Sequence, residues 1–300
     1  MKLLRTPDER FEKLPDYDFE PHYINVDDER YGELRMHYID EGSRDADVII
    51  LYPSQGAWVY MYRHMVPLLV ANGYRVIAPD YIGFGRSDKL SKEEDYEFNR
   101  HIAWNTSFLK QLGIINAIGF MFDWGGFFGL RIAAENPDIF CKLVLLNTQL
   151  PTGEPSAGHE WFIQWRGVQL ALPIFPQGEM VQEGTVKELS SEIVSAYDAP
   201  YPDQSYRTGP RRFPMILPIS PDSPAREANL AAWETLANWD KPVLTLFSKQ
   251  FEGSAMGPTT LLTHIPGCKN QAHALIDEAS FYIVEDQSHK LCDHLLKFAS

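Results

Sequence analysis

An aspartate in a sharp turn is the residue of this chain that is best placed to do chemistry. Asp123 lies in a Phe-Asp-Trp-Gly-Gly run, between an apolar stretch at residues 114–120 and a helical pattern at residues 127–134. A strand, a tight turn and a helix with a reactive residue at the apex form a nucleophile elbow. A carboxylate there suits attack on a carbon that bears a leaving group, with an alkyl ester as intermediate. The structural alternative for Asp123 is a helix N-cap.

The rest of the chain must supply the strands that position this turn. Short apolar runs alternate with helical patterns, which is typical of a mostly parallel sheet covered on both faces. The first two runs resemble an antiparallel pair, and the later ones are continuous, as buried parallel strands are. The sequence therefore predicts an α/β fold with a mostly parallel eight-stranded sheet, its strands at residues 22–26, 34–39, 48–52, 75–78, 116–120, 143–146, 243–247 and 273–276.

Strand patterns fade in the middle of the chain. The segment at residues 151–238 is rich in Pro, Trp and Tyr and has helical stretches at residues 186–197 and 225–236. We predict that it is a helical cap inserted into a core formed by residues 1–150 and 239–300. Such a cap would cover the carboxyl ends of the strands, where open α/β sheets bind their ligands.

Composition narrows the possible partners. The 300 residues carry a formal net charge of −14, with 44% hydrophobic and 23% charged residues. This charge argues against nucleic acid and anionic membranes as partners. The three cysteines are scattered without metal-ligand spacing, and neither a signal peptide nor an apolar run of about 20 residues is visible. We expect a cytoplasmic protein with a small apolar or aromatic substrate, no metal and no cofactor; the sequence leaves the oligomeric state open.

Four motifs together resemble those of haloalkane dehalogenases, a family of the α/β-hydrolase superfamily, and the resemblance covers nearly the whole chain. They are an oxyanion-type loop, a glycine-rich segment, the elbow and a cap motif, at residues 51–63, 79–88, 122–126 and 196–202. The resemblance implies an α/β-hydrolase fold with a helical cap.

The resemblance also implies roles for individual residues. Asp123 falls on the nucleophile, and Trp124 and Trp165 fall on two indoles that hold the departing halide. An indole N–H is a donor without acceptor capacity, so a pair of them suits a small anion. Gln55 falls on another halide-stabilising side chain, and the backbone N–H groups of Gln55 and Trp124 would form the oxyanion hole.

The chain departs from the family pattern in the part that hydrolyses the ester. Pro53-Ser54 stands where the family has His-Gly, and Phe281 stands where the resemblance puts the histidine base. The acid that orients this base is replaced by Phe251, with Glu252 the nearest carboxylate, and the alternative acid position holds Asn147. Phe251 and Phe281 are therefore expected to form an aromatic pocket wall.

We do not expect another histidine of the chain to replace the missing base. We expect His273, in a predicted strand, and His289, at the start of the last helix, to be structural. We expect His101 and His159 to lie at the surface or in the cap.

Three functions fit this pattern. The first is a hydrolytic dehalogenase or epoxide hydrolase with a displaced base. The second is a non-hydrolytic epoxide isomerase or cyclase, similar to the dehalogenase-like proteins of fungal quinolone alkaloid biosynthesis. There Asp123 would protonate the epoxide or stabilise a cation, and Phe251 and Phe281 would add cation–π attraction of ~0.5–2 kcal/mol each. The third is a ligand-binding pseudoenzyme, which has little use for a costly buried carboxylate. The missing base and acid favour the second.

Overall fold

The computed structural model describes residues 2–154, 159–172, 175–251 and 258–300, with the side chain of residue 159 excepted. Its centre is an eight-stranded sheet with the strand order β10-β9-β8-β7-β4-β5-β3-β2. Each predicted strand corresponds to one of these, so the predicted α/β-hydrolase fold is confirmed. The strands are β2 (His22–Asp28), β3 (Gly32–Glu41), β4 (Val48–Tyr52), β5 (Arg75–Pro79), β7 (Ala117–Phe122), β8 (Phe140–Leu146), β9 (Val243–Ser248) and β10 (Ala274–Ile276).

The sheet is antiparallel at one edge and parallel elsewhere. β3 pairs antiparallel with β2 and β5, and the remaining neighbours are parallel. Every residue of β7 and β9 is buried, as expected for central strands that are covered on both faces. A separate small sheet pairs β1 (Leu3–Leu4) with β6 (Lys89–Leu90).

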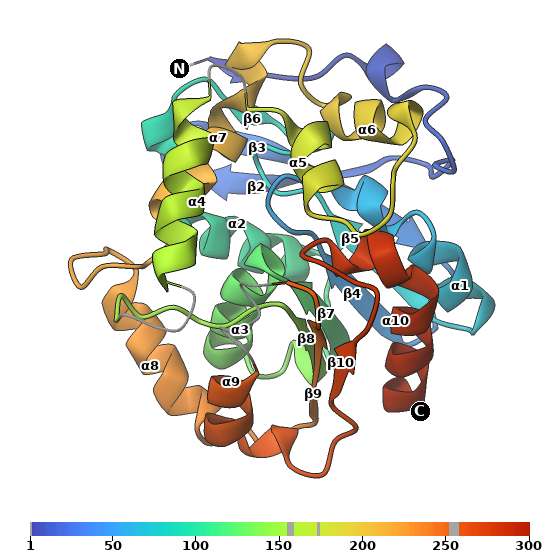
Figure 1. Cartoon of the computed structure of the whole chain (residues 1–300), viewed down its shortest axis with the longest axis vertical. Helices are drawn as coiled ribbons and strands as arrows, with labels where there is room; N and C mark the ends of the chain where they lie inside the picture. The colour runs from blue at the N-terminus through green and yellow to red at the C-terminus, as the bar shows by residue number, and fades with distance from the viewer. Residues whose placement is uncertain (1, 155–158, 173–174, 252–257) are drawn as a thin grey trace.

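Helices cover both faces of the sheet and create two apolar cores (Figure 1). One core lies under α2 (Phe98–Gln111), α3 (Trp124–Glu135) and α8 (Arg226–Leu236). The other lies under α1 (Met65–Ala71), the 3-10 helix η2 (Val59–Tyr62) and the C-terminal α10 (Ile283–Ala299). Shorter elements complete the layers: η1 (Asp8–Phe11), η3 (Glu93–Asp95), α9 (Thr259–His264) and η6 (Pro266–Cys268).

The chain between β8 and β9 is helical. Besides α8, it forms α4 (His159–Ala171), α5 (Gln177–Glu183), α6 (Ser191–Asp198), η4 (Gln204–Arg207) and α7 (Thr208–Ile216). Helices α4 to α7 gather at one end of the sheet, whereas α8 packs against α3 (Figure 1). The boundaries predicted for a cap, residues 151–238, stay a prediction.

Two features of the described residues bear on possible partners. No helix among them is both long and apolar enough to cross a lipid bilayer. Within the same residues, no group of His, Cys, Asp and Glu side chains is arranged to hold a metal ion.

Candidate active site

The turn between β7 and α3 places Asp123 above the end of the sheet. Its backbone has φ 49° and ψ −110°, a conformation that side-chain-bearing residues adopt only at a cost. The turn is held because the Asp123 N–H donates to the Leu146 carbonyl at 3.0 Å and the Thr148 hydroxyl donates to the Asp123 carbonyl at 2.7 Å. The Asp123 side chain makes no capping hydrogen bond to α3, so it does not act as a helix cap.

Two glycines let α3 start close to the sheet. A Cβ at Gly125 would lie 2.6 Å from the Tyr52 Cβ, and one at Gly126 would lie 2.2 Å from the Thr148 hydroxyl. Both distances are shorter than any normal contact. The Gly-Gly pair in the motif is thus explained by packing, which fixes where the Asp123 carboxyl points.

Three donors face the buried Asp123 carboxyl. The Ser54 hydroxyl donates to Oδ2 at 2.7 Å, and the Gln55 backbone N–H donates to the same oxygen at 3.4 Å. Burial raises the pKa of Asp123 to about 6, and hydrogen bonds from Ser54, the Trp124 backbone and the Gln55 backbone oppose this rise. Near neutral pH the carboxylate is therefore the main form, but it is less well solvated than an exposed one.

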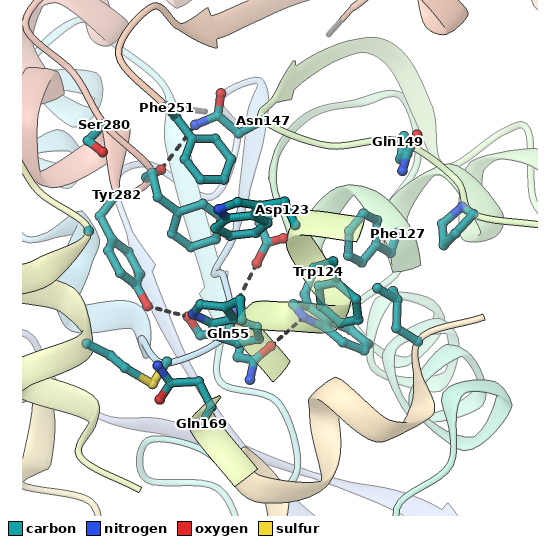
Figure 2. Close-up of a pocket in the computed structure, with 18 of the residues that line it drawn as sticks. Gln55, Asp123, Trp124, Phe127, Asn147, Gln149, Gln169, Phe251, Ser280 and Tyr282 are labelled. Atoms are coloured by element: carbon teal, nitrogen blue, oxygen red, sulfur yellow. Dashed lines mark hydrogen bonds between the residues drawn. The ribbon is translucent and has the colours of Figure 1, made fainter. Parts of the chain in front are cut away.

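Amide and indole donors lie beside this carboxyl. The Trp124 indole N–H donates to the Gln55 side-chain oxygen at 3.0 Å (Figure 2). The Gln55 side-chain Nε2 is buried and has no hydrogen-bond partner within the described ranges. The Gln55 backbone carbonyl accepts from the Tyr282 hydroxyl at 3.1 Å. Gln55 is thus fixed at its backbone, with an amide N–H group available to an anion.

Aromatic rings occupy the position at which the resemblance puts a base. The Phe281 ring packs against Phe122, Phe251 and Tyr282, with centroid distances of 5.5, 5.1 and 4.8 Å. Asn147 is engaged in structure: its Nδ2 donates to the Ser248 hydroxyl at 2.8 Å and to the Phe281 carbonyl at 3.1 Å. The Phe251 and Phe281 rings therefore contact each other here, and Glu252 lies outside the described residues.

These groups surround one cavity of about 470 Å³. The predicted site residues all line it: Gln55, Asp123, Trp124, Trp165, Phe251 and Phe281. Trp165 belongs to α4, and its ring stacks on that of Trp161 with a centroid distance of 6.2 Å. The indole N–H of Trp124 is instead hydrogen-bonded to the Gln55 side chain. The other described residues lining the cavity include Phe127, Gln149, Glu154, Trp161, Phe162, Gln169, Glu183, Phe247, Gln250, Ser280 and Tyr282.

Histidines do not replace the missing base in the part of the cavity wall that the structure describes. His273 is structural, since its Nδ1 accepts from the Thr245 N–H at 3.0 Å and its Nε2 donates to the Cys268 carbonyl at 2.7 Å. The expectation that His101 lies at the surface or in the cap is wrong. His101 lies on the apolar face of α2, which packs against the core, and its ring is buried between the rings of Tyr96 and Phe128. This burial lowers the pKa of His101 well below its usual range. The side chain of His159 is outside the described part of the chain.

Sequence reasoning missed one polar contact of the nucleophile position. From the sequence, Ser54 is only a departure from the family pattern, yet its hydroxyl donates the shorter of the two hydrogen bonds that Ser54 and Gln55 make to the Asp123 side chain. Its place directly before Gln55 in the oxyanion-type loop was the available signal. Tyr282, which supports Gln55, follows Phe281 and was likewise not singled out.

Comparison with known proteins gives consistent results. A family profile described as alpha/beta hydrolase fold matches residues 47–180. A haloalkane dehalogenase from Psychrobacter cryohalolentis is 48% identical over 298 residues, which cover 99% of this chain and 98% of the relative. One from Mycobacterium marinum is 43% identical, with 99% and 100% covered. The tetrameric haloalkane dehalogenase DpaA from Paraglaciecola agarilytica has a TM-score of 0.90 at 34% identity, with 99% and 98% covered.

These similarities correct the function that the sequence favoured. The lost base and acid favour an epoxide isomerase or cyclase of alkaloid biosynthesis. The full-length relatives, at up to 48% identity, are instead named haloalkane dehalogenases, which favours the hydrolytic alternative. The inference failed because it gave replaced side chains more weight than the retained nucleophile, donors and overall sequence.

Proposed function

Since the chain belongs to the haloalkane dehalogenase family of the α/β-hydrolase superfamily, we propose that it cleaves the carbon–halogen bond of small organic halides. In this proposal an Asp123 carboxylate oxygen attacks the halogen-bearing carbon, the carbon–halogen bond breaks, and the halide takes the bonding electrons. An alkyl ester of Asp123 remains and is released by water as an alcohol. The buried, hydrogen-bonded carboxyl on the cavity wall is the observation that carries this proposal.

The halide would be received by the donors beside Asp123. The free Nε2 group of Gln55 and the indole N–H of Trp124 are adjacent, and Trp165 lines the same cavity. Donors that are already in place can stabilise charge that develops on a leaving group without reorganising. A halide there would compete with the Gln55 side-chain oxygen for the Trp124 N–H.

The cavity wall indicates the kind of organic group that would be accepted. Aromatic and aliphatic side chains together form more than half of its described lining, and a volume of about 470 Å³ exceeds the needs of a two-carbon halide. We therefore propose primary alkyl bromides or chlorides with an apolar chain or ring as substrates, such as 1-bromo-3-phenylpropane.

Halide release tests the proposal directly. Bromide is measured after mixing the protein with 1-bromo-3-phenylpropane, alongside the isosteric variant Asp123→Asn. Release of at least one bromide per active site by the native chain, and none above background by the variant, is the expected result. Equal release by both proteins would contradict the role of Asp123. No release by either would remove the proposed activity toward this substrate class.

A further inference from the structure

The second half of the reaction has a chemical requirement that the described residues of the cavity wall are poorly suited to meet. Water must attack the carbonyl carbon of the Asp123 ester while it loses a proton and an alkoxide departs. A base within about 3 Å of that water normally accepts the proton.

The titratable side chains of the wall are poorly suited to this role. Glu154 and Glu183 are both exposed to solvent, and Glu154 forms an ion pair with Arg226. Burial holds the pKa of Tyr282 far above its usual range, and its hydroxyl is already donated to the Gln55 carbonyl. Besides Asp123 itself, these are the titratable side chains among the described residues that line the cavity.

Three neutral polar side chains beside Asp123 and the aromatic wall are engaged in hydrogen bonds. Both ends of the Asn147 amide are bonded, since its oxygen accepts from the Ser248 N–H at 2.9 Å and its nitrogen serves Ser248 and Phe281. The Ser248 hydroxyl donates to the Ser280 carbonyl. The Ser54 hydroxyl faces the Asp123 carboxyl.

The aromatic wall is held in place by its backbone. Asn147 binds the Phe281 carbonyl at 3.1 Å, and the Asp286 carboxylate accepts from the Ser280 N–H at 2.9 Å. The same carboxylate accepts from the Val186 and Lys187 N–H groups at 2.9 and 3.1 Å. The Phe281 ring is thus a fixed part of the cavity (Figure 2 labels its neighbours Phe251 and Tyr282).

From this geometry, and resting on the proposed function, we propose that the alkyl ester of Asp123 accumulates because its hydrolysis is far slower than its formation. The atoms balance at the first step: the alkyl group passes from halogen to the Asp123 oxygen and the halide leaves. Water later adds to the carbonyl carbon of the ester, the bond from this carbon to the alkoxy oxygen breaks, and a proton from water passes to the departing oxygen without help from a base. The products are the alcohol and the Asp123 carboxyl group. The protein then behaves as a nearly single-turnover alkyl acceptor.

Halide release and intact mass, measured together, test this inference. With excess 1-bromo-3-phenylpropane, bromide should rise in a burst of about one equivalent per site and then nearly stop. The protein mass should increase by one phenylpropyl group less one hydrogen, and the modified peptide should contain Asp123. Continued bromide release at the burst rate with unmodified protein would overturn the inference and leave the proposed function intact. The absence of both bromide and mass change would overturn both.

A restored base gives the converse test. Phe281→His should shorten the lifetime of the ester at least about tenfold, which converts the plateau into sustained bromide release. Phe281→Ala supplied with free imidazole is the second route, because imidazole can enter the space left by the ring. Phe162→Ala removes another ring of the same cavity and should keep the plateau with and without imidazole. An ester lifetime unchanged in both Phe281 variants would contradict the assignment of the slow step to this position.

Discussion

At Asp123, burial and hydrogen bonding act in opposite directions on one carboxyl group. Burial disfavours the charge, and the donors from Ser54 and the neighbouring backbone favour it. The balance matters because only the carboxylate is a nucleophile. A modest change in either effect therefore changes the fraction of protein molecules in which Asp123 is ionised and can react at a given pH.

The rate of ester formation should follow the ionisation of Asp123. Since burial raises its pKa to about 6, the burst rate should be constant above about pH 7 and fall about tenfold per pH unit well below pH 6. Rapid-mixing measurements of bromide release between pH 4.5 and 8.5 check this. A midpoint near 4, the range of an exposed aspartate, would contradict the effect of burial.

Removal of the Ser54 hydroxyl should shift this pH profile upward. The hydroxyl donates to the Asp123 carboxylate at 2.7 Å, and a hydrogen bond to a charged group is worth about 1.5–3 kcal/mol. The midpoint for Ser54→Ala should therefore rise by about one to two pH units. Ser280→Ala is the control, since Ser280 lines the cavity and has no recorded hydrogen bond from its hydroxyl to Asp123. An unshifted profile for Ser54→Ala would mean that the bond contributes no net stabilisation.

The position of a single residue could be predicted from the sequence where one local motif contains it. The elbow motif was enough to place Asp123, because a strand, a turn and two glycines fix that geometry locally. Ser54 could not be assigned in this way. Its contact joins positions 69 residues apart and depends on how the loop after β4 meets the turn after β7.

At the scale of elements, a buried ion pair and a tyrosine hydroxyl link η2, α6 and α10. Arg63, which ends η2, donates to both Glu285 carboxylate oxygens at 2.5 and 3.0 Å. The Tyr197 hydroxyl of α6 also donates to Glu285, which lies in the first turn of α10. Three elements that are distant in sequence therefore depend on one carboxylate.

Neutralising that carboxylate should destabilise the whole chain. Glu285→Gln leaves the buried Arg63 charge without a counter-charge, which costs about 3–5 kcal/mol for pairs of this kind. The free energy of unfolding from urea titration should fall by that order. Glu97→Gln breaks an ion pair with Arg30 in which both side chains are 44% exposed, so it should cost less than about 1 kcal/mol. Equal losses in the two variants would show that burial of the pair is unimportant.

Strands were easier to predict than the helices between β8 and β9. Continuous apolar runs identify buried strands because the lack of periodicity itself signals burial on both faces. The predicted helix at residues 186–197 instead begins at Ser191, after a Ser190 cap. The Asp286 carboxylate holds the Val186 and Lys187 N–H groups in a non-helical segment, a tertiary effect that a local pattern does not carry.

At the scale of the whole molecule, the chain is acidic, and the cavity is also lined by acidic side chains. The net charge is −14, and Asp123, Glu154 and Glu183 line the cavity. The described residues of its wall include no lysine, arginine or histidine. Neutral and cationic halides should therefore be accepted and anionic ones rejected. The negative balance was readable from composition, but which carboxyl groups line the cavity depends on the arrangement of the helices over the sheet.

Matched substrates that differ only in charge test this selectivity. A carboxylate held about 6 Å from Asp123, at an effective dielectric constant near 20, is repelled by about 3 kcal/mol. This energy corresponds to roughly a hundredfold in the second-order rate of bromide release. We therefore expect 6-bromohexanoate to react about 100-fold more slowly than neutral 6-bromohexanamide, while (6-bromohexyl)trimethylammonium reacts at least as fast as the amide. Glu97→Gln, which lowers the total negative charge outside the cavity, should leave this ratio nearly unchanged, because Glu97 is exposed and solvent screens its charge. Equal rates for the anion and the amide would show that the cavity carboxylates do not influence the choice of substrate.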